Sequence, residues 1–541
     1  MDMQNIVLPV WKTWYHQEVV TSFAGIDMIH MEVDQKWRKK MLKVYARETV
    51  EGKYPNGLAY SVHLGIVREG VTEPLHQNYG ILFPKARIDE RNVIVPSYVR
   101  NIKVSKSPSM NRYWIVGEDV LPDGTLHPDR EKCLWCWSTE DFISFEEMGL
   151  VETARLSELS GLSVEALKGS DEIAVPEEWE DRLRQYWNPL TFQDIQGDTV
   201  RYSDGSCHKK NLKKYPSLKF PLARGFGDPV ILLWKDMYYF IATNDNLDDI
   251  GLYVRKAAEP DDLFRDDTPM HLILDKDEKR GLIQTFWAPE FHIIGGNLYI
   301  LFAVSNENWG PQCHMMRLKE GGDILKAEDW EDPIKVMRAD GTPLGENGIT
   351  LDMTYVPSGD RHYYVWSYRE HIGTPLDSGS MLMVAEFSPR RPDRLISQPV
   401  CISRPLYGFE NTSGTINNEG PYAFCHEGTI YLAYSGGDAR GYLYTIGMLT
   451  ARFGADLCDA EVWTKEKTPV LSFASVPGEY GPGHNSFFRD REGDLWIAFH
   501  ATGSYEERVI SSGIRRVHMD ATGRPRFDLA REEDLPERYR K

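Results

Sequence analysis

The segment Ile430-Tyr431-Leu432-Ala433-Tyr434-Ser435 is rich in aromatic and branched residues and ends in small or polar ones. Four other segments have the same character: 238–243, 298–303, 363–367 and 495–500. Such short runs are typical of β-strands. Aligning Tyr239, Tyr299, Tyr364, Tyr431 and Trp496 gives intervals of 60, 65, 67 and 65 residues. Each interval is long enough for four strands and their loops, so the sequence predicts an all-β, five-bladed β-propeller over residues 219–530.

Turn-forming residues stand directly before most of these strands, as expected for a hairpin that joins the first and second strands of a blade. They are Gly295-Gly296-Asn297, Gly359-Asp360, Glu427-Gly428 and Glu492-Gly493-Asp494. The first strand of each blade therefore precedes its turn, and in a propeller this strand lines the central channel.

Residues at one offset from the aligned aromatics predict what faces that channel. Twelve residues before four of the aromatics, and eleven before Tyr239, the sequence has Trp287, Asp352, Glu419, His484 and Asp228. A purely structural position there favours valine, threonine or glycine. A proline recurs nearby in four blades, at Pro229, Pro289, Pro421 and Pro482. Proline is confined to strand edges and ends, and an innermost strand is such an edge. We expect the three carboxylates and the histidine to converge.

This combination suits cleavage of a glycosidic bond, which needs a proton donor beside the leaving oxygen and a second carboxylate. A third carboxylate can raise the pKa of the acid by like-charge proximity, and Asp352 fits that task. Trp287 offers a flat apolar face for a sugar ring. Structural alternatives stay open: a buried aspartate for Asp352, a core residue for Trp287, and a hydrogen-bonded core histidine for His484.

Five motifs in order resemble glycoside hydrolase family 43, the five-bladed arabinofuranosidases, xylosidases and arabinanases. They are Gly227-Asp228-Pro229, Trp287-Ala288-Pro289-Glu290, Leu351-Asp352, Asn418-Glu419-Gly420-Pro421 and Gly483-His484-Asn485-Ser486. The resemblance covers about residues 220–525. It implies that Asp228 is the general base, Glu419 the general acid of an inverting mechanism, and Asp352 the residue that tunes and orients the acid.

The same resemblance implies further site residues. His484 matches a histidine near the propeller axis, where many members hold a calcium ion or an ordered water, so a water-mediated structural calcium is its expected partner and no cofactor is expected to be required. Arg515 matches an arginine that often contacts substrate hydroxyls. One departure is that Met353 and Thr354 follow Asp352, where the family commonly has a small residue. The shape of the sugar pocket is therefore left open.

Composition excludes several other functions. The net charge of −19 argues against sequence-independent binding to nucleic acid or anionic lipid, and no apolar run is long enough to span a membrane. Seven scattered cysteines and an N-terminus without a basic and then apolar stretch predict a cytoplasmic protein. Only Cys133 and Cys136 have zinc-motif spacing, and buried thiols are the better interpretation of them. The oligomeric state is left open.

The first half of the chain is expected to hold an accessory domain. Residues 1–155 are β-rich, without channel carboxylates, and predict a partial propeller or a sandwich. Residues 156–218 predict a connector, with a helical leucine spacing and then a hairpin at 199–215. Residues 531–541 form a charged tail.

We therefore expect an exo-acting, inverting enzyme that releases terminal α-L-arabinofuranosyl or β-D-xylosyl residues from oligosaccharides derived from plant polysaccharides. Endo-arabinanase or galactosidase activity of the same family is the first alternative. A retaining propeller glycosidase, or a propeller that only binds glycans, is a further one, although a binding protein would be expected to have lost at least one carboxylate.

Overall fold

The computed structural model describes residues 39–188, 192–196, 199–202, 207–209, 220–345, 347–520 and 523–528. The charged tail expected at 531–541 lies outside the described residues. Strands dominate this part of the chain, and its helices are short: α1 (Asn56–Ala59), α2 (Thr153–Ser160), α3 (Val164–Leu167) and α4 (Trp179–Trp187). None of these described helices is long and apolar enough to cross a membrane. The all-β prediction is confirmed.

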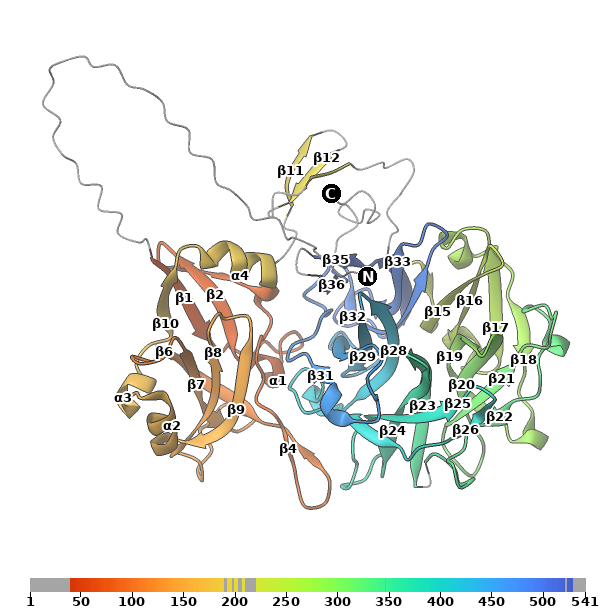
Figure 1. Ribbon diagram of the computed structural model, residues 1–541, viewed down its shortest axis with the longest axis horizontal. Coiled ribbons are helices and arrows are strands. Elements are labelled where there is room, and N and C mark those ends of the chain that lie inside the picture. Colours follow the sequence, from red (N-terminus) through yellow and green to blue (C-terminus); the bar gives the residue numbers. More distant parts are fainter. Residues whose placement is uncertain are drawn as a thin grey trace, which may run out of the picture. The chain divides into compact units, whose positions relative to one another are not determined.

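The part from residue 39 to residue 187 contains two antiparallel sheets of four strands each (Figure 1). The first has the order β10-β1-β2-β3, from β1 (Lys39–Tyr45), β2 (His63–Arg68), β3 (Val71–Pro74) and β10 (Glu172–Pro176). The second has the order β6-β7-β8-β9, from β6 (Tyr98–Lys106), β7 (Tyr113–Val120), β8 (Cys133–Thr139) and β9 (Phe145–Glu152). Both contribute to one buried core, which includes Leu42, Ile66 and Trp137.

The segment expected as a connector is tied into this first part. Its helices α2 and α3 cover a second core with Leu156 and Leu167, and β10 pairs with β1 to complete the first sheet. The sequence indicates no strand at β10, because five residues between two helices show too little alternation to reveal one. Farther on, β12 (Thr199–Tyr202) and β13 (Cys207–Lys209) pair antiparallel, next to β11 (Phe192–Gln196).

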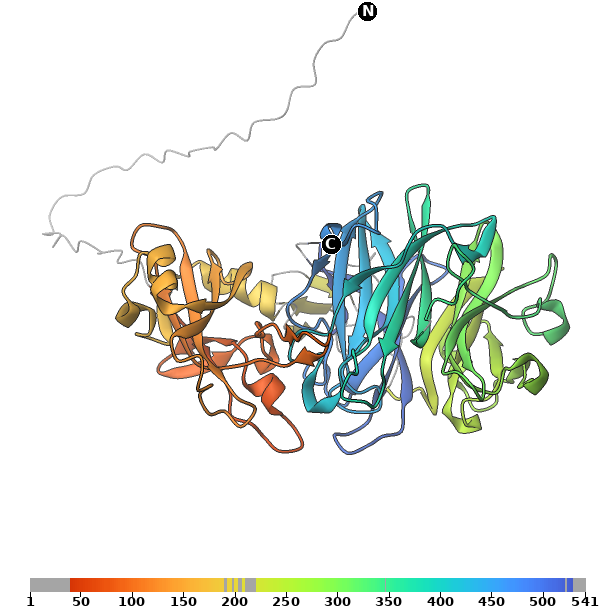
Figure 2. The ribbon, with the colours of Figure 1, turned by 90° about the horizontal axis from the view of Figure 1, so that it is seen from below.

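Residues 220–520 form five sheets that follow one another along the chain (Figures 1 and 2). The first is β15 (Phe226–Trp234), β16 (Met237–Asn244), β17 (Leu252–Ala257) and β18 (His271–Leu274); the second is β19 (Gln284–Ile294), β20 (Asn297–Ser305), β21 (Gln312–Arg317) and β22 (Ile334–Lys335). The third is β23 (Gly348–Ser358), β24 (Arg361–Glu370), β25 (Met381–Ser388) and β26 (Arg391–Leu395), with β27 (Val400–Ser403) also paired to β25. The fourth is β28 (Asn418–His426), β29 (Thr429–Gly436), β30 (Thr445–Arg452) and β31 (Thr464–Lys465).

The last sheet closes the series onto its start. It has the order β14-β34-β33-β32, so β14 (Ala223–Arg224) pairs with β34 (Ser511–Arg516), while β33 (Leu495–Thr502) lies between β34 and β32 (Tyr480–Arg489). The first strands form a ring: β15 contacts β19 and β32, β19 contacts β23, and β28 contacts both β23 and β32. This is the arrangement of a β-propeller. The predicted hairpin turns are found where expected, for example between β19 and β20 and between β28 and β29.

Candidate active site

Each of the five inner strands has a register irregularity near its first end, at matching positions of the ring. The irregularities lie just after Gly227, Trp287, Leu351, Glu419 and Gly483. The residue that follows has a positive φ in every case: Asp228 (52°), Ala288 (44°), Asp352 (55°), Gly420 (56°) and His484 (43°). Non-glycine residues rarely adopt this conformation, and when they do it is often at functional sites. Bulges of this kind redirect side chains and here mark one end of the channel.

These positions correct the alignment made from the sequence. Asp228, Asp352 and His484 are equivalent to one another, but their counterparts in the second and fourth sheets are Ala288 and Gly420. Trp287 and Glu419 come one residue earlier. The constant offset was misleading for two reasons. Leu351 pairs with Ser367, three residues after the aligned Tyr364, whereas in the other sheets the corresponding paired residue comes four residues after the aligned aromatic. Gly483 pairs with His500, seventeen residues on, whereas the other four hairpins span sixteen residues. The predicted convergence nevertheless holds for the two aspartates, Glu419 and His484.

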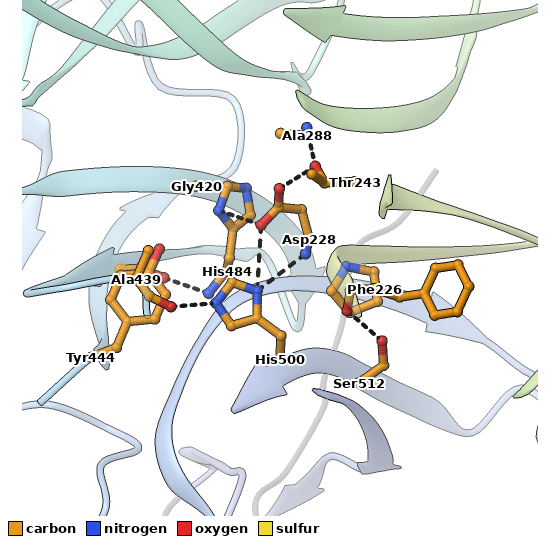
Figure 3. A network of polar contacts seen from close by, with 12 residues as sticks. Phe226, Asp228, Thr243, Ala288, Gly420, Ala439, Tyr444, His484, His500 and Ser512 are labelled. Atoms are coloured by element: carbon orange, nitrogen blue, oxygen red, sulfur yellow. Dashed lines mark hydrogen bonds and ion pairs between the residues drawn. The ribbon is translucent and has the colours of Figure 1, made fainter. Parts of the chain in front are cut away.

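Asp228 is held by three neighbours (Figure 3). Its Oδ1 lies 3.0 Å from Nδ1 of His484, and its Oδ2 accepts a hydrogen bond from the Thr243 hydroxyl. Burial alone would raise the pKa of Asp228, but the charge of His484, the neighbouring His500 ring and the Thr243 hydroxyl together outweigh it and hold this pKa well below its usual range. The side chain is 14% exposed. Asp228 is therefore an ionised carboxylate that solvent can reach.

His500 supports Asp228 from the other side. The backbone N–H of Asp228 lies 3.1 Å from Nδ1 of His500. Because an amide N–H can only donate, Nδ1 must accept, which leaves the ring proton on Nε2, 3.2 Å from the Ala439 carbonyl oxygen. Burial lowers the pKa of His500, in keeping with a neutral ring. His500 thus fixes the backbone at the strained Asp228.

Asp352 lies deeper than Asp228, with only 1% of its side chain exposed. Its Oδ2 accepts hydrogen bonds from the Ser367 hydroxyl at 3.0 Å and from the backbone N–H of Gly420 at 3.1 Å. Burial raises the pKa of Asp352, and the charge of Asp228 adds to the effect. The bond to Gly420 joins Asp352 to the residue next to Glu419. Met353, whose size was unexpected after Asp352, is buried in the core between sheets.

Glu419 is the carboxylate of the fourth sheet and is partly exposed. Its Oε1 accepts a hydrogen bond of 2.9 Å from the Tyr444 hydroxyl, and the Tyr444 ring stacks on His500 at 5.4 Å. Burial raises the pKa of Glu419 to about 7, and the charge of Asp352 acts in the same direction. At neutral pH a large share of Glu419 carries a proton, as a general acid requires.

His484 is surrounded by carboxylates. Burial lowers its pKa, but the charges of Asp228, Asp352, Glu419 and Glu290 outweigh burial and raise it. Its Nδ1 pairs with Oδ1 of Asp228 at 3.0 Å, and its Nε2 lies 3.9 Å from Oδ1 of Asp352. A cation such as His484 repels calcium, which prefers six to eight oxygen ligands. The described residues contain no group of three histidine, cysteine or acidic side chains that could hold a metal. A calcium ion held through water by His484 needs no such group, so it stays a prediction, and the chemistry below is derived without a metal.

The two substrate-contact candidates differ in their position. Trp287 is half-buried next to the bulge of the second sheet, and its indole N–H donates to Oδ2 of Asp249 at 2.9 Å. Arg515 lies instead on β34, the third strand of its sheet, where its guanidinium forms an ion pair with Glu479 and lies 4.7 Å from the ring centre of Phe499. The structure does not bring Arg515 to the three carboxylates.

Several residues of the site were not assigned from the sequence. His500, Tyr444 and Thr243 contact the carboxylates directly, and all three come from second strands or the loops after them. Their signal was weak, although His500 ends the fifth aromatic segment and Thr243 ends the first. Glu290, the last residue of the second motif, is buried, and its carboxylate lies 2.6 Å from Nε2 of His292.

Comparison with known proteins gives a consistent family. The model of "Glycosyl hydrolases family 43" matches residues 219–525. An extracellular exo-alpha-(1->5)-L-arabinofuranosidase of Streptomyces avermitilis is 31% identical over 328 residues, covering 58% of this chain and 64% of that protein. A protein of the same name from Streptomyces chartreusis is 30% identical over 293 residues, covering 53% of this chain and 83% of that protein. A crystal structure of alpha-L-arabinofuranosidase from Lactobacillus brevis is 25% identical, with a TM-score of 0.49, and covers 59% of this chain and 97% of that one.

These relatives also correct one prediction. Both Streptomyces proteins are named extracellular, which contradicts the cytoplasmic location expected from the sequence. Six cysteines in the described part of the chain are free. A free cysteine shows only that it forms no disulfide and does not identify the cellular compartment. The family itself is established by a match over more than half of the chain, in the region that carries the three carboxylates. The chain belongs to glycosyl hydrolases family 43.

Proposed function

We propose that this glycosidase removes terminal α-L-arabinofuranosyl residues from oligosaccharides by inversion, with Asp228 as general base, Glu419 as general acid and Asp352 as the residue that tunes the acid. The observation that carries the proposal is the opposite ionisation of two solvent-accessible carboxylates. Asp228 has a pKa well below its usual range, whereas the pKa of Glu419 is raised to about 7. Pairs of groups whose surroundings separate their pKa values are the basis of acid and base roles.

The reaction follows from these two states. Glu419 gives its proton to the glycosidic oxygen as the bond from that oxygen to the anomeric carbon breaks. A water molecule on the opposite face of the sugar bonds to the same carbon and passes a proton to Asp228. The hydroxyl of Tyr444 already donates to Glu419, so it stabilises the carboxylate that forms. Proton exchange with solvent then restores both groups, since both are partly exposed.

Asp352 acts through its neighbours. It is fully buried, so we infer that it does not receive the attacking water or the leaving group. Its charge raises the pKa of Glu419, and its carboxylate holds the backbone of Gly420 beside the acid. Replacing it is expected to lower the pKa of Glu419 and to loosen the strand end at the same time.

The substrate class is supported by the names of the relatives, both Streptomyces proteins being called exo-arabinofuranosidases. The half-buried indole of Trp287 next to the site is suited to pack against a sugar ring. A β-D-xylosyl end, a galactosyl end and the interior of an arabinan are the competing substrates.

We further infer the domain assignment. Residues 219–530 form the catalytic propeller, and each of its five sheets is one blade. The ring of inner strands and the pairing of β14 with β34 support this assignment. In the first half that the structure describes, residues 39–187 form a β-rich accessory domain, which includes α2, α3 and β10 of the segment expected as a connector.

A panel of nitrophenyl glycosides tests the substrate, and proton NMR of the first released sugar tests the stereochemistry. We expect the highest kcat/KM on the α-L-arabinofuranoside, and β-L-arabinofuranose as the first product before mutarotation. Preferential cleavage of the β-D-xyloside or of internal arabinan bonds would replace the proposed substrate. The α-anomer as first product would show a retaining mechanism and contradict the base role of Asp228.

A further inference from the structure

A fourth carboxylate, outside the channel, lies next to the general acid without contacting it. Glu410 is in the loop between β27 and β28 and has no exposed surface. Four groups donate to it: the Tyr407 backbone N–H at 2.9 Å, the Asn418 amide at 2.9 Å, the Tyr434 hydroxyl at 2.6 Å and Lys465 Nζ at 2.6 Å. A buried charge with this many donors is rigid. The mechanism described above does not use it.

Lys465 lies on β31, the outermost strand of the fourth sheet, and forms the ion pair with Glu410; its side chain is 18% exposed. Besides Glu410, its Nζ donates to the Arg404 carbonyl oxygen at 2.8 Å and lies 3.2 Å from Oδ1 of Asn418. Burial lowers the pKa of Lys465, and the charge of Glu410 opposes this. Burying the charge of Glu410 is costly unless its partners are also satisfied, and the Lys465 ammonium finds two further acceptors here.

Both charges converge on Asn418, the residue directly before Glu419. Asn418 is fully buried, and its side chain is bound at both ends. The amide nitrogen donates to Glu410, while Oδ1 accepts from Lys465 and from the Ser403 hydroxyl at 2.6 Å. Its backbone N–H donates to the Ser380 carbonyl oxygen at 3.0 Å. The first residue of β28 is therefore fixed on every side, and Glu419 follows it at the bulge.

The loop that carries Glu410 also packs against the first half of the chain. The backbone N–H of Ala86 donates to the Leu406 carbonyl oxygen at 2.7 Å, and the Tyr407 hydroxyl donates to Glu147 at 3.3 Å. At Gly57 a Cβ atom would lie 2.3 Å from the Thr412 hydroxyl oxygen, so this contact tolerates no side chain. The accessory domain thus supports the loop from outside.

We propose that Glu410 and Lys465 are positioning residues for the general acid: through Asn418 they fix the strand end that aims Glu419 at the glycosidic oxygen, and the first half of the chain keeps their loop in place. The inference rests on the proposed acid role of Glu419. A displacement of about 1 Å in a reacting group can cost on the order of 100-fold in rate. Correct placement of the Glu419 carboxyl affects the rate only when the leaving oxygen must be protonated.

The full chain with Glu410→Gln tests this, compared on an arabino-oligosaccharide and on a dinitrophenyl α-L-arabinofuranoside. The substitution keeps the shape but removes the charge that Lys465 and Asn418 share. We expect kcat on the oligosaccharide to fall about 10- to 100-fold, with KM little changed, while kcat on the dinitrophenyl substrate falls about threefold or less because its leaving group needs no proton. A misaimed acid gives this selective loss, and a general loss of structure does not.

Two further variants make the result decisive. Tyr434→Phe removes one hydrogen bond to Glu410 and keeps the ring, so it is the milder change and serves if Glu410→Gln fails to fold. It should shift the ratio of the two rates in the same direction by about threefold. Glu180→Gln is the matched control, since Glu180 is a buried carboxylate of the first half that pairs with Lys40, Arg68 and Arg184. It should lower the melting temperature and leave the ratio unchanged.

The ratio of the two rates distinguishes failure of the positioning role of Glu410 from failure of the acid role of Glu419. If Glu419→Ala shows the leaving-group preference but folded Glu410→Gln and Tyr434→Phe do not, the positioning role is wrong. If Glu419→Ala itself lacks the preference, the proposed acid is wrong and the positioning role falls with it.

Discussion

Two sides of the channel opening contain the same kind of side chain in opposite surroundings. On the side of the first and last sheets, Asp228 faces the cationic ring of His484 and the hydroxyl of Thr243, and its pKa is held well below the usual range. On the side of the third and fourth sheets, burial raises the pKa of Glu419 to about 7, and the charge of Asp352 adds to the rise, while the hydrogen bond from Tyr444 opposes it. The strand position supplies a carboxylate on each side, and the neighbours decide whether it takes or gives a proton.

Removing the base is expected to have the largest effect. Asp228→Ala leaves no group to accept the proton of water, whatever the leaving group, so kcat should fall on the order of 10²–10⁴-fold on both an oligosaccharide and a dinitrophenyl glycoside. Steady-state kinetics on the two substrates measure this. Added azide should rescue the rate, if at all, by giving a glycosyl azide of inverted configuration. A loss confined to the oligosaccharide would instead identify Asp228 as the general acid and contradict its role as the base.

Removing the charge of His484, which lies close to both sides, should shift both limbs of the pH profile. His484 lowers the pKa values of both Asp228 and Glu419. In His484→Gln both should rise, so the acidic limb, where Asp228 becomes protonated, and the basic limb, where Glu419 loses its proton, both move to higher pH. We expect a loss of roughly 10- to 100-fold at neutral pH. The pH dependence of kcat/KM tests this, and limbs that stay in place would show that the histidine is only structural.

A smaller change affects the acid alone. The hydrogen bond from Tyr444 lowers the pKa of Glu419, so Tyr444→Phe should raise that pKa and shift only the basic limb to higher pH. A rate loss of about tenfold or less is expected, since one hydrogen bond is removed and the ring is retained. A shift of the basic limb to lower pH would contradict the assignment of that limb to Glu419.

Chelation is expected to have the smallest effect. The described residues offer no group of three ligands for a metal, and His484 is already paired with Asp228. Treatment with a calcium chelator should leave activity within about twofold and the melting temperature nearly unchanged. Complete unfolding that calcium reverses would contradict this account of the axis.

The sequence predicted the parts of this site that repeat along the chain. The aromatic second strands and their turns gave the sheets and identified the strands that carry Asp228, Asp352, Glu419 and His484. It could not predict that Glu419 lies one residue off the equivalent position. The aligned aromatic of the third sheet is shifted by one residue and the fifth hairpin is one residue longer, and neither has a local signal. Arg515 was named from the family resemblance, and a resemblance does not show that a guanidinium is already paired with Glu479. The role of Glu410 could not be predicted, because it depends on the contacts that Lys465 and Asn418 make with this loop residue.

The central claim is that Glu419 gives the proton, and the rate of Glu419→Ala as a function of leaving group tests it most directly. Across a series of aryl α-L-arabinofuranosides of decreasing leaving-group pKa, the variant should lose on the order of 10²–10⁴-fold on an oligosaccharide and progressively less toward the dinitrophenyl substrate. The unmodified enzyme should show a weaker dependence on that pKa. Equal losses on all substrates, in a variant whose circular dichroism shows it to be folded, would contradict the acid role.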